Sequence, residues 1–138
     1  MMQDNCIFCK IIAGDIPSAT VYEDEDFKVI MDIFPAARGH VIVIPKKHAA
    51  NLYELEEESA SKALIVAKKV AKAMKAELGC EGLNLLQNNG EVAGQTVDHF
   101  HIHLIPRSEE DTVNVTWPQG SYKDGEAAQI ADAIAKGI

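Results

Sequence analysis

Three of the chain's five histidines fall within five residues, at alternate positions, in the stretch His99–Ile105. Apolar residues stand between and after them, so the stretch has a period of two, which predicts a β-strand. One face of this strand would carry the imidazoles of His99, His101 and His103, and the other face would enter the core. Because a strand is rigid, the row of imidazoles would be held in a fixed geometry.

A row of imidazoles has three interpretations. A chance polar face would be unusual, because such faces mostly carry Thr, Ser, Lys or Glu. Alternate histidines could also hold a catalytic zinc ion that keeps an open coordination position. The third interpretation is covalent catalysis, in which a neutral imidazole attacks phosphorus while its neighbours stabilise the phosphate oxygens.

A loop rich in glycine and side-chain amides precedes the histidines, at residues 88–96. Gly90 and Gly94 would let main-chain N–H groups approach an anion closely. The loop lacks the Gly-Lys-Ser/Thr of a P-loop, and by itself it could be an ordinary hairpin turn. Beside three histidines it indicates a phosphate-binding loop, which favours phosphoryl or nucleotidyl transfer over metal catalysis.

The pattern His-φ-His-φ-His-φ-φ at residues 99–105 resembles the signature of the histidine-triad (HIT) superfamily. Other stretches resemble its nucleotide-binding (Hint) branch, and together they extend over roughly residues 6 to 120. These stretches are Phe8-x-Lys10-Ile11-Ile12, Ile16-Pro17, Asp32-Ile33-x-Pro35, the run from His40 to His48, Gly94-Gln95-Thr96 and Trp117-Pro118-x-Gly120. The triad together with the Ile-Pro-Lys-Lys-His run that ends at His48 is a highly specific combination.

Composition narrows the class of protein. A length of 138 residues suits a single domain over residues 1–138. The net charge of −8 argues against nucleic acid as a main partner, which would require a basic face. We find no signal peptide and no apolar run long enough to span a membrane. Three cysteines, an odd number, fit a reducing cytoplasm better than a disulfide framework.

Hydrophobic periodicity predicts an α+β protein in which short hairpin connections make the sheet antiparallel. The resemblance implies a five-stranded antiparallel sheet with one long helix packed on it. Expected helices are 7–13, 54–78 and 124–136, and expected strands are 20–24, 27–32, 41–44, 83–87 and the histidine stretch. The last helix departs from the Hint pattern, whose members end soon after the Trp-Pro segment.

Cys6 and Cys9 form a C-x-x-C pair near the N-terminus. They could be two small core residues, a redox pair or half of a zinc site, although no strand precedes Cys6 as a thioredoxin-like pair would require. Some bacterial proteins that resemble this chain complete a structural zinc site with the histidine after Lys-Lys and the first triad histidine. The resemblance therefore implies zinc on Cys6, Cys9, His48 and His99, which would leave the chemistry, with no further cofactor, to His101 and His103.

The resemblance also implies roles for residues around the triad. Asp32 could serve a turn or could bind ribose hydroxyls, and Ile33, Phe8 and Ile11 could form a base pocket or plain core. His40 could be an ordinary edge histidine, but the resemblance places it behind the nucleophile, which it would tune through hydrogen bonds. The phosphate and leaving group would be held by Asn88, Gly94, Gln95, Thr96, His101 and His103, with Thr96 standing where relatives often carry Ser.

These roles describe a cytoplasmic hydrolase for purine nucleoside 5′-phosphoramidates or related nucleotidyl conjugates. His101 would attack the α-phosphorus, and water would then release the nucleoside monophosphate. Two alternatives remain open: a dinucleoside polyphosphate hydrolase, and a nucleotide-binding interaction protein with incidental turnover. The resemblance further implies a homodimer in which the partner's C-terminal segment approaches the active site, and Trp117 is the residue here that would need such a partner.

Overall fold

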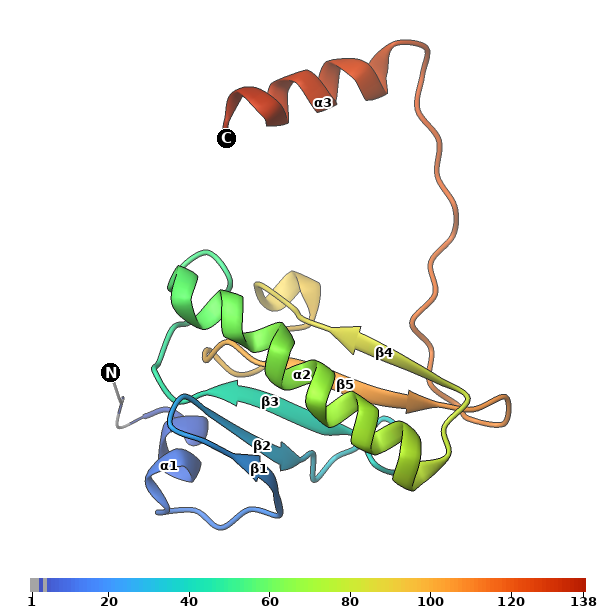
Figure 1. Ribbon diagram of the computed structural model, residues 1–138. Coiled ribbons are helices and arrows are strands. Elements are labelled where there is room, and N and C mark those ends of the chain that lie inside the picture. Colours follow the sequence, from blue (N-terminus) through green and yellow to red (C-terminus); the bar gives the residue numbers. More distant parts are fainter. Residues whose placement is uncertain (1–2, 4) are drawn as a thin grey trace.

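A five-stranded antiparallel sheet forms the centre of the molecule, in the computed structural model that describes residues 3 and 5–138 (Figure 1). The strands lie in the order β1-β2-β3-β5-β4, which confirms the predicted α+β class. The elements along the chain are α1 (Ile7–Ala13), β1 (Thr20–Glu23), β2 (Phe27–Met31), β3 (Val41–Pro45), α2 (Glu57–Leu78), β4 (Gly82–Leu86), the 3-10 turn η1 (Glu91–Ala93), β5 (Ile102–Arg107) and α3 (Glu126–Lys136).

The strand β3 is apolar throughout because both faces of the sheet are covered. Val41 and Val43 belong to the core under α2, whereas Ile42 and Ile44 belong to a second core under α1. Successive side chains of a strand point to opposite faces. Alternate residues of a strand therefore join different cores, and the face on which a side chain lies decides whether it packs under α2 or on the side of α1.

The long helix α2 covers one face of the sheet (Figure 1). It buries Ala63, Val66, Ala67, Val70 and Met74, which follow the expected helical spacing. Gly79 ends the helix in the left-handed conformation, at φ 61°. The helix starts three residues later than predicted, at Glu57, because the preceding residues form turns in which the Asn51 side chain accepts the Glu54 N–H.

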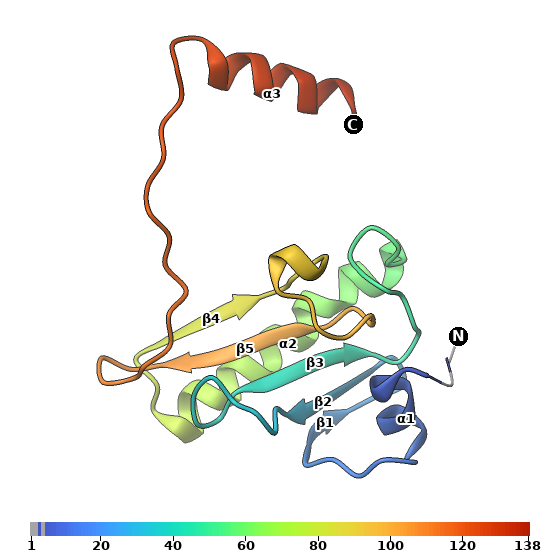
Figure 2. The ribbon, with the colours of Figure 1, turned by 180° about the vertical axis from the view of Figure 1, so that it is seen from behind.

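The short helix α1 covers the opposite face of the sheet, as the view from behind shows (Figure 2). Its bounds are those predicted, and the Cys6 sulfur caps it by accepting the Cys9 N–H at 3.4 Å. The helix buries Phe8, Cys9 and Ile11 against the sheet. This face carries α1 and the candidate site side by side.

β1 and β2 each end one residue earlier than predicted, because aspartates there serve turns. Asp24 accepts the N–H groups of Asp26 and Phe27 at 2.8 and 2.7 Å, which closes the hairpin between β1 and β2. Asp32, just after β2, accepts the Phe34 N–H at 2.8 Å. Asx turns of this kind compete with the strand ladder for main-chain donors.

The C-terminal arm, residues 112–138, leaves the body beyond β5 and carries α3 away from the sheet (Figures 1 and 2). Arg107 anchors its start, since the guanidinium pairs with Asp111 and donates to the Val113 carbonyl. The predicted last helix is present, from Glu126 to Lys136, but none of its residues is buried. Trp117 is 79% exposed on this arm.

Among the residues that the structure describes, no helix combines the length and apolarity needed to cross a membrane.

Candidate active site and metal centre

The histidine stretch enters the sheet later than predicted. β5 begins at Ile102, so His103 lies in the strand while His99 and His101 lie in the segment just before it. Continuing the β3–β5 register would place Phe100 opposite Pro45, which has no N–H for a ladder hydrogen bond. The alternation itself is present, because Phe100, Ile102 and Leu104 all enter the core under α2.

The strand pattern predicted one row of three imidazoles, whereas the family resemblance implied that His99 would join the cysteines. In the structure His99 is directed at the cysteines. Its ring is fully buried, and its Nδ1 lies 3.4 Å from the Cys6 sulfur, 3.6 Å from the Cys9 sulfur and 3.1 Å from His48 Nδ1. The Cys9 sulfur is in turn 3.4 Å from His48 Nδ1. The structure thus brings Cys6, Cys9, His48 and His99 together, with all four donor atoms within 4.8 Å of one another.

This donor set fits a tetrahedral metal ion. Zinc bonds to sulfur and imidazole nitrogen at standard lengths would set neighbouring ligand atoms about 3.3–3.8 Å apart, close to the distances seen here. The Nε2–H of His99 donates to the Pro45 carbonyl at 2.7 Å, so Nδ1 carries a lone pair directed at the thiols. One lone pair cannot satisfy three neighbours by hydrogen bonding, whereas a cation at the centre of the cluster can.

His101 has its tautomer determined by a main-chain carbonyl. Its Nδ1 is 2.6 Å from the carbonyl oxygen of His99, and since that oxygen can only accept, Nδ1 carries the proton. Burial lowers the pKa of His101, which keeps the ring neutral near pH 7. The remaining nitrogen, Nε2, therefore carries a lone pair.

His103 has the opposite tautomer. The N–H of Ala36 donates to His40 Nδ1 at 3.0 Å, so the proton of His40 is on Nε2 and is donated to His103 Nδ1 at 2.9 Å. This leaves the proton of His103 on its own Nε2. Burial lowers the pKa of His103 to about 4, so this ring is also neutral. His40 therefore hydrogen-bonds to His103 and not to His101, the nucleophile it was predicted to tune.

The same chain of hydrogen bonds argues against a second metal ion at Asp32, His40 and His103, whose donor atoms also lie within 4.8 Å of one another. A metal on His40 Nε2 would need that nitrogen unprotonated, which would force a proton onto Nδ1 against the Ala36 N–H. Asp32 instead places its Oδ2 3.5 Å from His40 Nε2. One oxygen of the Asp32 carboxylate accepts the turn hydrogen bond from Phe34, and the other faces His40.

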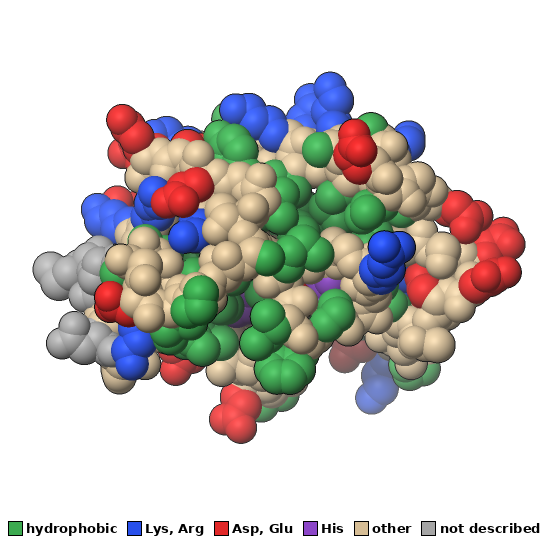
Figure 3. Space-filling model, turned by 90° about the horizontal axis from the view of Figure 1, so that it is seen from below, with side chains coloured by type: hydrophobic (Ala, Val, Ile, Leu, Met, Phe, Trp, Pro, Cys, Tyr) green, Lys and Arg blue, Asp and Glu red, His purple; other side chains and the backbone are tan. Residues whose placement is uncertain are grey.

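His101 and His103 line a pocket of about 300 Å³ whose other walls are mostly apolar. Ile7, Phe8 and Ile11 of α1 form one wall, as part of a lining that also includes Asp32, Ile33 and Thr96. Figure 3 shows histidine atoms at the bottom of a hollow between hydrophobic side chains. A shape of this kind suits a flat apolar group with one charged end.

The loop before the triad is largely occupied with its own hydrogen bonds. The N–H of Gly94 donates to Glu91 at 2.9 Å, and that of Gln95 donates to Gly90 at 3.1 Å. The Gln95 side chain is buried, where it accepts the Gly90 N–H and donates to the carbonyls of Ala50 and Val97. Of Gly94, Gln95 and Thr96, which were all predicted to hold phosphate, Thr96 is the one that lines the pocket.

Asn88 also contacts the loop, since its Nδ2 donates to the Gly94 carbonyl at 3.4 Å. Gly94 has φ +97°, and a Cβ there would lie 3.3 Å from Asn88 Nδ2, so the glycine allows this close contact. Sequence reasoning missed the Pro45 carbonyl and the Ala36 N–H, which have no signature because they are main-chain atoms. Ile16 and Pro17 were noted for the family resemblance but not as pocket residues, and Val97 was not noted at all; all three line the pocket.

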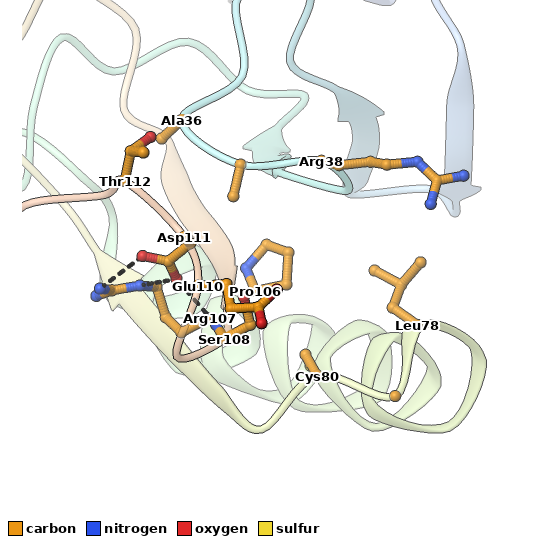
Figure 4. Close-up of a pocket in the computed structure, with 12 residues that line it drawn as sticks. Ala36, Arg38, Leu78, Cys80, Pro106, Arg107, Ser108, Glu110, Asp111 and Thr112 are labelled. Carbon is orange, nitrogen blue, oxygen red and sulfur yellow. Dashed lines mark hydrogen bonds and ion pairs between the residues drawn. The ribbon is translucent and has the colours of Figure 1, made fainter.

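A second hollow lies at the other end of β5 (Figure 4). Pro106, Arg107 and Leu78 line it, and no histidine does. The Arg107 guanidinium in its wall is already paired with Asp111, and Arg107 also donates to Asn84 at 2.6 Å. The groups able to do chemistry therefore converge on the histidine pocket and not on this one.

Comparison with known proteins agrees with this geometry. A family model described as the HIT domain matches residues 13–110. The chain is 47% identical to "Protein hit" of Bacillus subtilis, covering 96% of this chain and 94% of that protein. It is 43% identical to the adenosine 5′-monophosphoramidase hnt1 of Schizosaccharomyces pombe, covering 97% and 98% of the two chains.

Solved structures agree as well. A crystal structure of a HIT family member from Bacillus subtilis superposes with a TM-score of 0.93 at 46% identity, covering 98% of both chains. A zinc-bound histidine triad family protein from Mycobacterium smegmatis superposes with a TM-score of 0.76 at 34% identity, covering 96% of this chain and 94% of that one. The matched family model, these relatives and the triad geometry together show that the chain belongs to the HIT domain family.

Proposed function

We propose that the protein hydrolyses purine nucleoside 5′-phosphoramidates or related nucleotidyl conjugates through a nucleotidyl group on His101. The observation that carries the proposal is the pair of opposite tautomers in one pocket. His101 offers a lone pair at Nε2, and His103 offers a proton at Nε2. A nucleophile and a hydrogen-bond donor side by side are what displacement at a phosphate requires.

The chemistry follows from these two nitrogens. His101 Nε2 attacks the α-phosphorus and the bond from phosphorus to the amine breaks. The amine leaves with a proton that comes from solvent and is relayed through the Thr96 hydroxyl, and the water that later attacks phosphorus returns a proton to solvent. His103 Nε2–H donates to a phosphate oxygen as charge develops there. The hydrogen bond from His101 Nδ1–H to the His99 carbonyl stabilises the positive charge that the ring gains. Water then attacks phosphorus, which releases the nucleoside monophosphate and restores His101.

Binding roles are assigned to the residues around these histidines. Asp32 holds the ribose hydroxyls with the carboxylate oxygen that faces His40, and Ile33 lies over the base at the pocket rim. Asn88, Gly94 and Gln95 act on the phosphate indirectly, because they shape the loop that presents Thr96. The relative named as an adenosine 5′-monophosphoramidase supports this class of substrate, and the three free thiols support a reducing, cytoplasmic location.

The four-residue cluster is proposed to hold structural zinc. A closed Cys₂His₂ site has no open position for substrate, so its contribution when occupied is to join α1 and the loop after β3 to the segment before β5. We also propose a homodimer, as the resemblance implies. β4 lies at the edge of the sheet, and both Leu64 and Ile65 on α2 are more than half exposed, which supports a partner on these elements.

The substrate is tested by direct comparison. The protein is expected to show a higher kcat/KM for adenosine 5′-phosphoramidate than for a diadenosine polyphosphate, measured side by side under the same conditions. A preference for the dinucleotide would reassign the protein to the dinucleoside polyphosphate hydrolases. Slow turnover of both, with tight nucleotide binding, would instead indicate an interaction protein.

His101→Ala is expected to abolish hydrolysis and to leave binding of adenosine monophosphate nearly intact. The variant loses the nucleophile but keeps the apolar walls, Asp32 and His103. Removal of a covalent nucleophile costs several orders of magnitude in kcat, whereas His103→Ala removes one donor and should cost about 10²–10³-fold. The measurements are steady-state kinetics and calorimetric binding. Acid quench of the wild-type enzyme during turnover should trap a nucleotidyl group on His101, and near-normal turnover by His101→Ala would contradict the mechanism.

The purified protein is expected to contain one zinc ion per chain. Cys6→Ala should lose the metal and unfold at a lower temperature, since one of four ligands is gone, while its activity falls less than that of His101→Ala. Elemental analysis and thermal melts measure both effects. Cys80→Ala is the control, because Cys80 lies outside the cluster and should leave metal content unchanged. Purified protein without zinc, and without affinity for added zinc, would refute the assignment.

The protein is expected to be a dimer in solution at micromolar concentration, with about twice the 15.0 kDa mass of one chain. Light scattering coupled to gel filtration measures that mass directly. A charge on the exposed α2 face, as in Ile65→Glu, should shift the mass toward the monomer, whereas Val92→Glu on η1 should not. A wild-type mass of a single chain would rule the dimer out.

A further inference from the structure

His99 makes polar contacts through three of its atoms. Its Nδ1 joins the Cys6 and Cys9 sulfurs, its Nε2–H donates to the Pro45 carbonyl, and its main-chain carbonyl accepts from His101 Nδ1–H. Because this last contact holds the proton on Nδ1 of His101, the lone pair of His101 is on Nε2, the nitrogen that is free to attack. The ring held in the metal cluster and the carbonyl that sets the tautomer of His101 thus belong to the same residue, His99.

The helix α1 provides a second connection between the metal cluster and the pocket. It carries Cys9 and follows Cys6, while Ile7, Phe8 and Ile11 line the pocket. The Phe8 ring lies edge-on to His99, with ring centres 5.9 Å apart, and edge-on to His101 at 5.0 Å. A helix of seven residues has little stability of its own, so its position depends on what it is attached to.

The core on the α2 side of the sheet lies apart from this attachment. The core under α2 is a separate cluster that includes Val43, Val70, Met74 and Leu104, whereas Cys6 and Cys9 belong to the core under α1. Loss of the metal should therefore loosen α1 and the segment before β5 while the sheet and α2 stay folded. Local opening of this kind is expected where a short element rests on few contacts.

We propose that occupancy of the Cys6–Cys9–His48–His99 cluster positions the nucleophile: the bound metal holds the His99 carbonyl against His101 Nδ1–H and holds α1 as the pocket wall. The proposal rests on the proposed function, since it takes zinc in the cluster and His101 as nucleophile. It goes further in making His99 a positioning residue and metal occupancy a condition for a formed site. The metal-free chain would remain folded but would present His101 in mixed tautomers inside a pocket that lacks one wall.

The first test compares metal-loaded and metal-free protein without using activity. Zinc is removed with a chelator under reducing conditions, and circular dichroism establishes that the chain is still folded. Nitrogen NMR of the imidazoles should show His101 as the Nδ1–H tautomer with zinc and as a tautomer mixture without it. Affinity for adenosine monophosphate should fall about tenfold or more, which corresponds to about 1.4 kcal/mol, and added zinc should restore both readings.

The second test separates positioning from loss of stability. His48→Ala removes the one ligand that lies neither in α1 and its N-cap nor in the triad segment. Met74→Ala, which truncates a buried side chain of α2, is the control for loss of stability, and the melting temperatures of both variants are measured. His48→Ala should raise KM and lower kcat by about 10- to 100-fold. Its NMR spectrum should show His101 in the same mixture of tautomers as the metal-free wild-type protein. Met74→Ala should leave KM, the kcat per folded molecule and the tautomer unchanged.

The results that would overturn the proposal are distinct from those that would overturn the proposed function. A folded metal-free chain with the wild-type tautomer and nucleotide affinity would refute it, as would a Met74→Ala variant that behaves like His48→Ala. If chelation unfolds the chain, His48→Ala alone decides between the two outcomes. Failure of the metal-loaded wild type to hydrolyse phosphoramidates would refute the proposed function only, because the tautomer and binding comparisons do not depend on turnover.

Discussion

The hydrogen bond from His101 Nδ1–H to the His99 carbonyl is the interaction on which the proposed chemistry depends. At 2.6 Å it determines which nitrogen of His101 carries the proton, and therefore which nitrogen can attack. A side-chain acceptor could rotate away, whereas a main-chain carbonyl moves only with its peptide. That peptide is held by the ring of His99, which is fully buried between the Pro45 carbonyl and the two cysteines.

The two buried faces of the sheet explain how a short stretch can serve two tasks. Phe100, Ile102 and Leu104 contribute to the core under α2, and the alternate residues His101 and His103 line the pocket beside α1. A shift of the register by one residue would exchange the two sets and bury imidazoles among apolar side chains. Packing of the core under α2 thus keeps the histidines on the pocket side.

Under the proposed function, neutral imidazoles would bind an anionic group in a protein whose net charge is −8. His103 places a hydrogen-bond donor in the pocket, and the one charged side chain among the described residues of the pocket lining, Asp32, is directed at His40. Burial favours the neutral form of both His101 and His103, so the lone pair and the donor coexist near pH 7. Protonation of His101 would remove the lone pair that the proposed mechanism uses, so the depressed pKa of His101 fits that mechanism.

The sequence by itself determined the period of two around the triad, the helical spacing of α2, the turn residues and the residue types of both sites. These features are local, because strand and helix periods follow from backbone geometry and capping residues act within one turn. The family resemblance implied that His99 joins Cys6 and Cys9. The tertiary structure alone decided that the Pro45 carbonyl orients the His99 ring, that His40 pairs with His103, and that Gln95 braces its loop. In each case the deciding partner is a main-chain atom or a residue distant in sequence, such as Pro45, Ala36 or Ala50, and such partners are brought together only when the chain folds.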